Sequence, residues 1–208
     1  MADANPDATT LARWATAHGF TPSERLLQGE TPLLRQGMMD IASDAHEGEL
    51  DGRLARIFNL YVDAPGVPLF GDTGTTTAAF TVLLVGVDAP AWPRVTIHPA
   101  EFSEGDWLTR LLRHDDHRVR NVDPEFDRRF RLRVADLTPD AAVDGLRDPD
   151  LVAWCVAQPG LIFDLENNVD TGDSLVVAGA GDDLDEAGLD GLAEQARWLA
   201  AWFERPAR

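Results

Sequence analysis

A short run of alternating residue types near the middle of the chain places the strongest constraint on the fold. In this run, which ends at Asp136, three apolar residues alternate with three arginines: Phe130, Leu132 and Val134 with Arg129, Arg131 and Arg133. A period of two is typical of a β-strand with one buried face, because successive side chains point to opposite sides of a sheet. The preceding segment, Asp123–Phe126, has the composition of a turn. The pattern therefore predicts a turn followed by a half-buried strand.

The arginines of this strand are candidate binding residues. Arg129, Arg131 and Arg133 are predicted on the face opposite the apolar side chains, in a chain with a formal net charge of -18. Guanidinium groups bind carboxylates and phosphates through paired N–H donors. The three arginines could bind such a ligand or an acidic partner protein. Alternatively, they balance the acidic residues of the chain's own C-terminal third.

The remaining periodic segments predict an α+β fold, because strand-like runs arrive in hairpins and helices lie between and after them. Strands are expected near 34–45, 54–62, 79–88, 94–98, 119–122, 161–166 and 174–179, and helices near 10–18, 104–113, 139–147, 149–157 and 183–204. We expect an antiparallel sheet built from hairpins, with short helices and a long C-terminal helix packed on it. The 208 residues fit a single domain, 1–208, with two similar halves near 1–115 and 116–208 as an option.

The C-terminal helix has a clear amphipathic pattern. Its apolar residues recur at the spacing of one helical face: Leu189, Leu192, Ala196, Leu199 and Phe203. We expect this face to be buried against the sheet.

Charge and composition restrict the partners. Asp and Glu number 36 against 18 basic residues, all of them arginine. Nucleic acids and anionic membranes would be repelled by such a surface. The sequence shows neither a signal-peptide pattern nor an apolar run long enough to span a bilayer, and its single cysteine excludes an intramolecular disulfide. We expect a cytoplasmic protein that does not insert into membranes.

An H-D-D-H run is the densest cluster of possible metal ligands. It offers His114, Asp116 and His117, which are residue types that bind zinc and related cations. Arg113 and Arg118 flank the run and would oppose a cation. A solvated connection between a helix and a strand is the favoured interpretation, with a metal site as the alternative. The other histidines are isolated in the sequence and form no triad with a nucleophile: His18, His46 and His98.

Two Asp-Thr-Gly tripeptides begin at Asp72 and Asp170. Aspartic proteases use such a pair to hold two carboxylates against one another. Neither copy follows the apolar strand that would fix it in a dry cleft, and the tripeptide is also an ordinary turn composition. We favour turns. A hydrolase would require two or more of the residues Asp72, Asp170, His114 and His117 to converge in one pocket.

Three further features favour structural roles. Cys155 lies in an apolar helix, which predicts a buried and unreactive thiol. The segment 183–194 partly matches a calcium-binding loop, but Ala187 stands where an acidic ligand is needed. Its aspartates are typical of a helix N-terminus. The six tryptophans predict core packing, or a partner-binding patch if one proves exposed.

The order of several short motifs resembles a family of uncharacterised bacterial proteins that contain a domain of unknown function. The motifs are an F-D-x-x-F-x-[VL] strand from Phe126, a closing L-D-x-L helix at 189–192, an L-x-x-W-A segment from Leu11, the segment 95–102, and P-x-L-x-x-W from Pro149. Many members carry N-terminal transmembrane segments, which this sequence does not show. The resemblance implies a fold and no activity, substrate or cofactor.

From these features we expect a non-catalytic protein-interaction or regulatory domain with a protein partner and no cofactor. The alternative is a hydrolase or metal-dependent enzyme that uses Asp and His residues. The sequence does not predict an oligomeric state.

Overall fold

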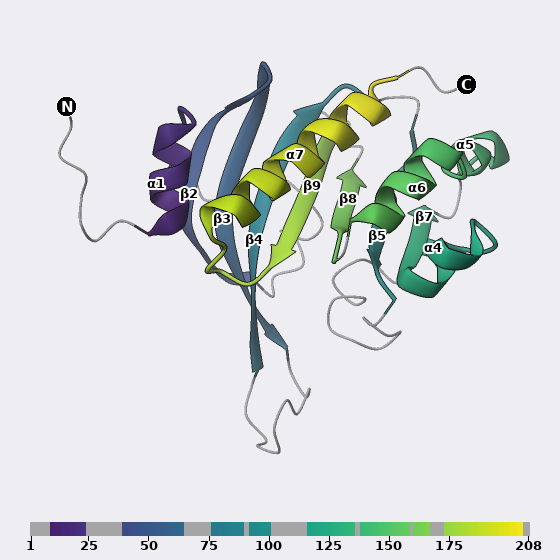
Figure 1. Ribbon diagram of the computed structural model, residues 1–208, viewed down its shortest axis with the longest axis horizontal. Helices are drawn as coiled ribbons and strands as arrows, with labels where there is room; N and C mark the ends of the chain where they lie inside the picture. The colour runs from purple at the N-terminus through teal and green to yellow at the C-terminus, as the bar shows by residue number, and fades with distance from the viewer. Residues whose placement is uncertain are drawn as a thin grey trace.

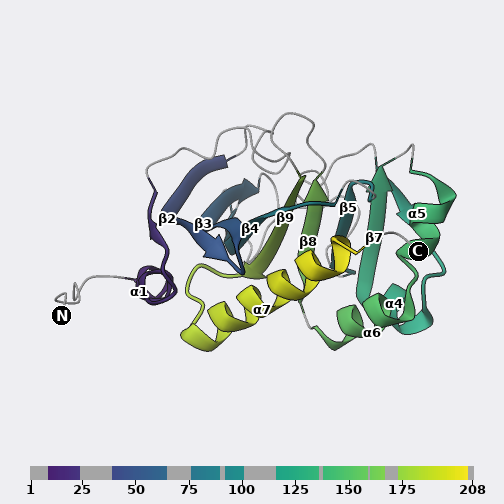
Figure 2. The same ribbon diagram turned by 90° about the horizontal axis from the view of Figure 1, so that it is seen from above.

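The computed structural model describes residues 9–23, 39–64, 76–89, 92–100, 116–135, 138–158, 160–166 and 173–205. Within these ranges, strands form one antiparallel sheet and the helices cover one of its faces (Figures 1 and 2). The strands are β1 Thr21–Pro22, β2 Met39–Leu50, β3 Arg53–Ala64, β4 Thr76–Val87, β5 Val95–Pro99, β6 Asp116–Val119, β7 Phe130–Ala135, β8 Ile162–Glu166 and β9 Asp173–Ala180. The helices are α1 Thr10–Ala17, α4 Pro124–Arg129, α5 Asp140–Gly145, α6 Pro149–Ala157 and α7 Glu186–Phe203.

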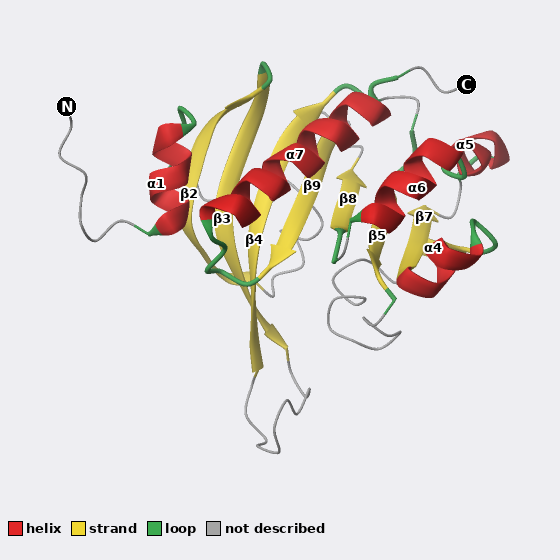
Figure 3. Cartoon of the chain, viewed as in Figure 1, coloured by secondary structure: helices red, strands yellow, loops and turns green. Residues whose placement is uncertain are grey.

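The sheet has the strand order β1-β2-β3-β4-β9-β8-β5-β7-β6. Strands β1 to β4 follow one another, and β8 and β9 form a hairpin whose second strand pairs with β4. Strand β5 lies between β8 and β7, so a strand from the first half of the chain is inserted among strands of the second (Figure 3). The prediction of an α+β fold with an antiparallel sheet and a long C-terminal helix is confirmed.

The half-buried strand is confirmed as β7. Phe130, Leu132 and Val134 are buried and alternate with partly buried residues. Strand β4 differs, because consecutive residues of both its faces are buried from Phe80 to Val85. A strand covered on both sides has an almost continuous apolar sequence rather than an alternating one.

The predicted turn before β7 is wrong, because helix α4 begins there. The Asp123 side chain accepts hydrogen bonds from the backbone N–H groups of Glu125 (2.8 Å) and Phe126 (3.1 Å), and Pro124 occupies the first helical position. Asp followed by Pro begins a helix as readily as a turn, because proline lacks only an N–H that the first helical turn leaves unbonded. Arg129 therefore ends a helix and does not belong to the strand.

The strand predicted at 119–122 lies earlier in the chain. Strand β6 ends at Val119, whereas the sequence predicted a strand beginning there; Asn121 has a φ of 59°, which interrupts an extended chain. The predicted helix at 104–113 lies outside the described residues.

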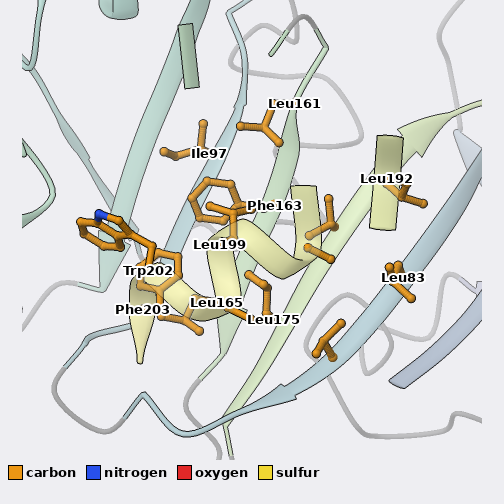
Figure 4. Packing of buried hydrophobic residues seen from close by; sticks show 14 of the residues in the cluster. Leu83, Ile97, Leu161, Phe163, Leu165, Leu175, Leu192, Leu199, Trp202 and Phe203 are labelled. Atoms are coloured by element: carbon orange, nitrogen blue, oxygen red, sulfur yellow. The ribbon is translucent and has the colours of Figure 1, made fainter. Parts of the chain in front are cut away.

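Helix α7 crosses the middle of the sheet and provides much of the core (Figure 1). All five residues predicted for its buried face are at most 3% exposed. Figure 4 shows this packing: the labelled side chains of α7 are Leu192, Leu199, Trp202 and Phe203, and those of β8 and β9 are Phe163, Leu165 and Leu175. Burying one such side chain contributes about 1.5–3 kcal/mol.

An aromatic cluster closes this end of the core. The ring of Phe203 lies 5.8 Å from Phe163, 5.7 Å from Trp92 and 5.0 Å from Trp202, each in an edge-to-face arrangement. Edge-to-face contacts place the positive ring edge against a negative ring face. Phe203 therefore joins α7 to β8 and to the segment before β5.

An ion pair joins the end of α7 to the start of β3. Arg53 donates two hydrogen bonds to the carboxylate of Glu204, from Nε at 3.0 Å and from Nη2 at 2.6 Å. These bonds hold the pKa of Glu204 below its usual value, against the opposing effect of burial. The pair lies beside the β2–β3 turn and is partly buried.

Replacing Phe203 with Ala should lower the free energy of unfolding by about 3–5 kcal/mol, because it removes a fully buried ring and leaves a cavity. Urea denaturation followed by tryptophan fluorescence measures the change. Leu54→Ala is the control: Leu54 is 77% exposed, so its truncation should cost less than about 0.5 kcal/mol. Equal losses in the two variants would contradict the core described above.

Glu204→Gln should destabilise the protein by about 1 kcal/mol at neutral pH. The folded-state pKa of Glu204 is depressed, so its stabilising effect is present above the unfolded-state pKa. That effect is lost as the pH falls through the folded-state pKa. The difference between the variant and the native protein should accordingly disappear in acid, which urea denaturation at a series of pH values measures. Glu194→Gln, at an exposed position of α7, is the control; a pH-independent difference would contradict the ion-pair explanation.

Candidate functional site

The sheet face opposite the helices, here called the distal face, carries the polar groups that can recognise a ligand. Among the described helices, all lie on the other side of the sheet (Figure 2). One continuous row of cross-strand neighbours crosses the distal face from β2 to β6: Glu47, Arg56, Leu84, Val176, Asp164, Thr96, Arg133 and Arg118. Side chains at registered positions point to the same side of a sheet, so these residues are successive neighbours.

The row is polar at both ends and apolar in the middle. Leu84 and Val176 are buried at its centre. Next to them, the Thr96 hydroxyl donates to Asp164 Oδ1 at 3.0 Å, and both side chains are buried. A buried carboxylate is costly unless it is hydrogen-bonded, and this bond supplies part of its solvation. Because the buried Leu84 and Val176 lie between them, the two polar ends of the row are separate.

One end is the histidine–arginine cluster, formed by His98, Arg118, Arg131 and Arg133. Arg131 and Arg133 lie on the distal face of β7, as the alternation predicted, and both are partly buried. His98 of β5 is in register with Arg131, and Arg118 of β6 is in register with Arg133. The residues lie on three adjacent strands.

His98 is the most buried member of the cluster, with 1% of its surface exposed. Its Nδ1 lies 3.0 Å from the carbonyl oxygen of Pro99. Burial lowers the pKa of His98, and the positive charges of Arg133, Arg131 and Arg118 lower it further, while the contact with Pro99 acts in the opposite direction. The imidazole is therefore neutral near neutral pH.

Arg129 is not part of this cluster. It lies in the last turn of α4, where its Nε donates to Glu125 Oε1 at 2.7 Å and its Nη1 donates to the carbonyl of Val156 at 2.9 Å. The latter bond joins α4 to α6. The structure thus brings Arg131 and Arg133 together with His98 and Arg118, and places Arg129 on a helix.

The other end of the distal face is hollowed into a pocket of about 520 Å³. Strands β1 to β4 and β9 line it, with Glu47, Glu49 and Asp173 as carboxylates and Arg56 as a cation. Leu54 lies in its wall, 77% exposed, and is in register with Glu49. The pocket is therefore acidic and has an exposed apolar side chain beside a carboxylate.

Two of the pocket carboxylates already have partners. Glu47 Oε2 accepts from the Ser23 hydroxyl at 3.1 Å and lies 3.8 Å from Arg56 Nε. Asp173 Oδ2 accepts from the backbone N–H of Ala89 at 3.0 Å. These contacts fix the pocket walls. This site has no signature in the sequence, because its residues come mainly from five strands and form no motif.

The predicted metal ligands are only partly within the described residues. His114 lies outside them, while Asp116 and His117 occupy consecutive positions of β6 and His117 is exposed. The described residues contain no group of three or more His, Cys, Asp or Glu side chains placed to hold a metal ion. The expected solvated connection is thus a strand over 116–119.

The other residues that the sequence singled out are the two Asp-Thr-Gly tripeptides, Cys155 and the partial calcium-loop match. Asp72 and Asp170 lie outside the described residues. Cys155 is buried, as predicted, and burial raises the pKa of its thiol to about 12, so it is protonated at neutral pH. Asp185, within the partial calcium-loop match, caps α7 by accepting from the N–H of Gly188 at 2.8 Å.

The tryptophans that the structure describes are mainly core residues. Trp14, Trp92 and Trp202 are buried, and Trp107 lies outside the described residues. Trp154 of α6 and Trp198 of α7 are partly buried and stack face to face, with ring centroids 4.1 Å apart. Each ring therefore covers one face of the other at the junction of the two helices.

None of the helices in the described ranges combines the length and the apolar character required to cross a membrane.

Comparison with known proteins shows a shared fold. No protein-family model and no curated protein matches the chain. Among solved structures, the chain is similar to the mycobacterial trehalose monomycolate transport factor A, TtfA, with a TM-score of 0.59 and 17% sequence identity. The alignment covers 97% of this chain and 99% of TtfA. The resemblance to a family of uncharacterised bacterial proteins stays a prediction.

Proposed function

We propose that the protein is a non-catalytic binding module, and that the distal-face pocket binds a segment of a partner protein that combines an apolar with a basic side chain. The observation that carries this proposal is Leu54, a large apolar residue that is 77% exposed in the wall of the pocket. Exposed apolar side chains in a hollow mark binding surfaces more often than isolated ones on a convex surface do.

Charge complementarity determines the kind of segment. Glu47 is neutralised in part by Arg56, whereas Glu49 is exposed and lies directly across from Leu54. A partner that buries an apolar side chain on Leu54 would place its neighbouring residue near Glu49, where an arginine or lysine is favoured. Polar and charged groups at the rim of an interface provide specificity and association rate more than affinity.

The comparison with TtfA is compatible with this proposal. TtfA is described as a transport factor for trehalose monomycolate, and a transport role can be served by binding without catalysis. At 17% identity, the similarity supports a common fold only. The kind of partner therefore has to be inferred from the side chains of this protein.

Peptides selected from a displayed random library on the purified protein should share an apolar residue next to Arg or Lys. Leu54→Asp and Glu49→Arg should each weaken the binding of a selected peptide by about tenfold or more, because one removes the apolar contact and the other reverses the charge. Fluorescence anisotropy with the labelled peptide measures the affinity. Binding should also weaken as salt is added.

Glu194→Arg is the matched control, because it makes the same charge reversal at an exposed position of α7. It should leave the affinity within about twofold of the native value, apart from general screening. Selected peptides without basic residues, or undiminished binding by the Leu54 and Glu49 variants, would contradict the proposal.

A further inference from the structure

Three glycines lie inside the described strands, and packing explains two of them. A Cβ atom on Gly48 of β2 would lie 2.9 Å from the ring of Phe20. A Cβ atom on Gly179 of β9 would lie 3.0 Å from Leu184 Cδ1. Both distances are shorter than an ordinary van der Waals contact, so a larger residue would displace its neighbour. Glycine is therefore required at both positions by the side chains packed against it.

Gly86 of β4 has no such explanation. A Cβ atom on Gly86 would lie 3.6 Å from the carbonyl oxygen of Leu54, which is an ordinary contact, and would meet no other atom of the described residues within 4 Å. The φ angle of Gly86 is not positive, so the backbone does not require glycine either. Inside a strand, glycine costs conformational entropy and packs no side chain. A glycine of this kind often marks a place where a ligand comes close to the backbone.

The open space above Gly86 belongs to the distal-face pocket. Leu54, Leu84, Gly86 and Ser174 all line that pocket. Ser174 of β9 is in register with Gly86, and Leu54 lies on the other side of it, on β3. Adjacent strands are 4.7–4.9 Å apart, so Leu54 and Ser174 are about 10 Å apart across Gly86. The pocket therefore has a flat floor of bare backbone, with an exposed leucine on one side and a small hydroxyl side chain on the other.

We propose that an aromatic side chain of the partner segment lies flat on Gly86, between Leu54 and Ser174. This assignment rests on the function proposed above and names the apolar side chain that the pocket recognises. The face of the ring packs on the backbone of β4, and its edge packs on Leu54.

The shape of the floor favours an aromatic ring over an aliphatic side chain. A planar ring places all its atoms on a flat surface, whereas a branched aliphatic side chain touches such a surface with only part of its methyl groups. Aromatic side chains also supply a large contact area at a low cost in conformational entropy. Within designed sheets, aromatic side chains cover strand glycines in the same way.

The position of the ring also places the basic residue of the partner. Glu49 is exposed and lies across from Leu54 on β2, so it is on the side of Leu54 that faces away from Gly86. The basic group that pairs with Glu49 is therefore about 10 Å from the ring, which is two strand spacings. The long side chain of an arginine or lysine covers much of this distance from a position next to the aromatic residue.

Peptides selected on the native protein should share Phe, Tyr or Trp as their apolar residue. Replacing that residue with Leu should weaken binding by about fivefold or more, measured by fluorescence anisotropy. In glycine-labelled protein, the Hα resonances of Gly86 should move upfield when the peptide binds, because protons beneath the face of an aromatic ring are shielded.

Gly86→Val should weaken peptide binding by about tenfold or more, because its side chain fills the floor of the pocket. Gly191→Val is the matched control: Gly191 lies on α7, and a Cβ atom there meets no described residue within 4 Å. The control should keep the affinity within about twofold of the native value. Circular dichroism reports whether each variant folds. If Gly86→Val does not fold, Gly86→Ala replaces it; this smaller change makes only an ordinary contact and should weaken binding by about threefold or more.

The outcomes separate this assignment from the function on which it rests. Aliphatic residues at the shared peptide position, unmoved Gly86 resonances, or full affinity in a folded Gly86→Val protein would overturn the assignment. If Leu54→Asp and Glu49→Arg still lose binding in that case, the proposed function stands without it. Undiminished binding by those two variants, or a library that yields no binder, would contradict both.

Discussion

Helix α7 packs its apolar side across strands β4 and β9 and reaches β8 through Phe203, at the point where the hairpins of the two ends of the chain meet. The sheet formed by the described strands needs this contact, because β9 joins β4 to β8 and brings together strands from both halves of the chain. The pairing of β4 with β9 joins segments that are far apart in the sequence, and its formation costs loop-closure entropy. The hydrophobic burial along α7 stabilises this pairing. The other described helices lie on the same face as α7, whereas the pocket opens on the distal face near the β2–β3 turn.

The long-range pairing determines where the polar groups meet. His98 and Arg131 are 33 positions apart in the sequence numbering and become neighbours only because β5 is inserted between β8 and β7. Likewise, Glu49, Leu54 and Asp173 meet at one pocket because β9 returns to pair with β4. The two candidate sites are consequences of strand order rather than of local motifs.

The periodicity of apolar residues predicted those helices and strands that have one buried and one exposed face. The alternation in β7 and the apolar stripe of α7 are confirmed residue by residue, because each pattern reports a single buried face. The Asp123–Phe126 segment was misread, because Asp-Pro is compatible both with a turn and with a capped helix and only the hydrogen bonds of the fold decide. For this reason Arg129 was wrongly placed on the strand with Arg131 and Arg133. His98 was not predicted to lie beside these arginines, because it belongs to another strand.

We propose that recognition takes place on the distal face, at the pocket and away from α7. Hydrogen exchange of the backbone amides, measured by mass spectrometry with and without a bound partner segment, tests it most directly. We expect added protection in β2 and β3 near the turn that joins them and in the first residues of β9, with the junction of α6 and α7 unchanged. Protection confined to α6 and α7, around the stacked Trp154 and Trp198, would contradict it.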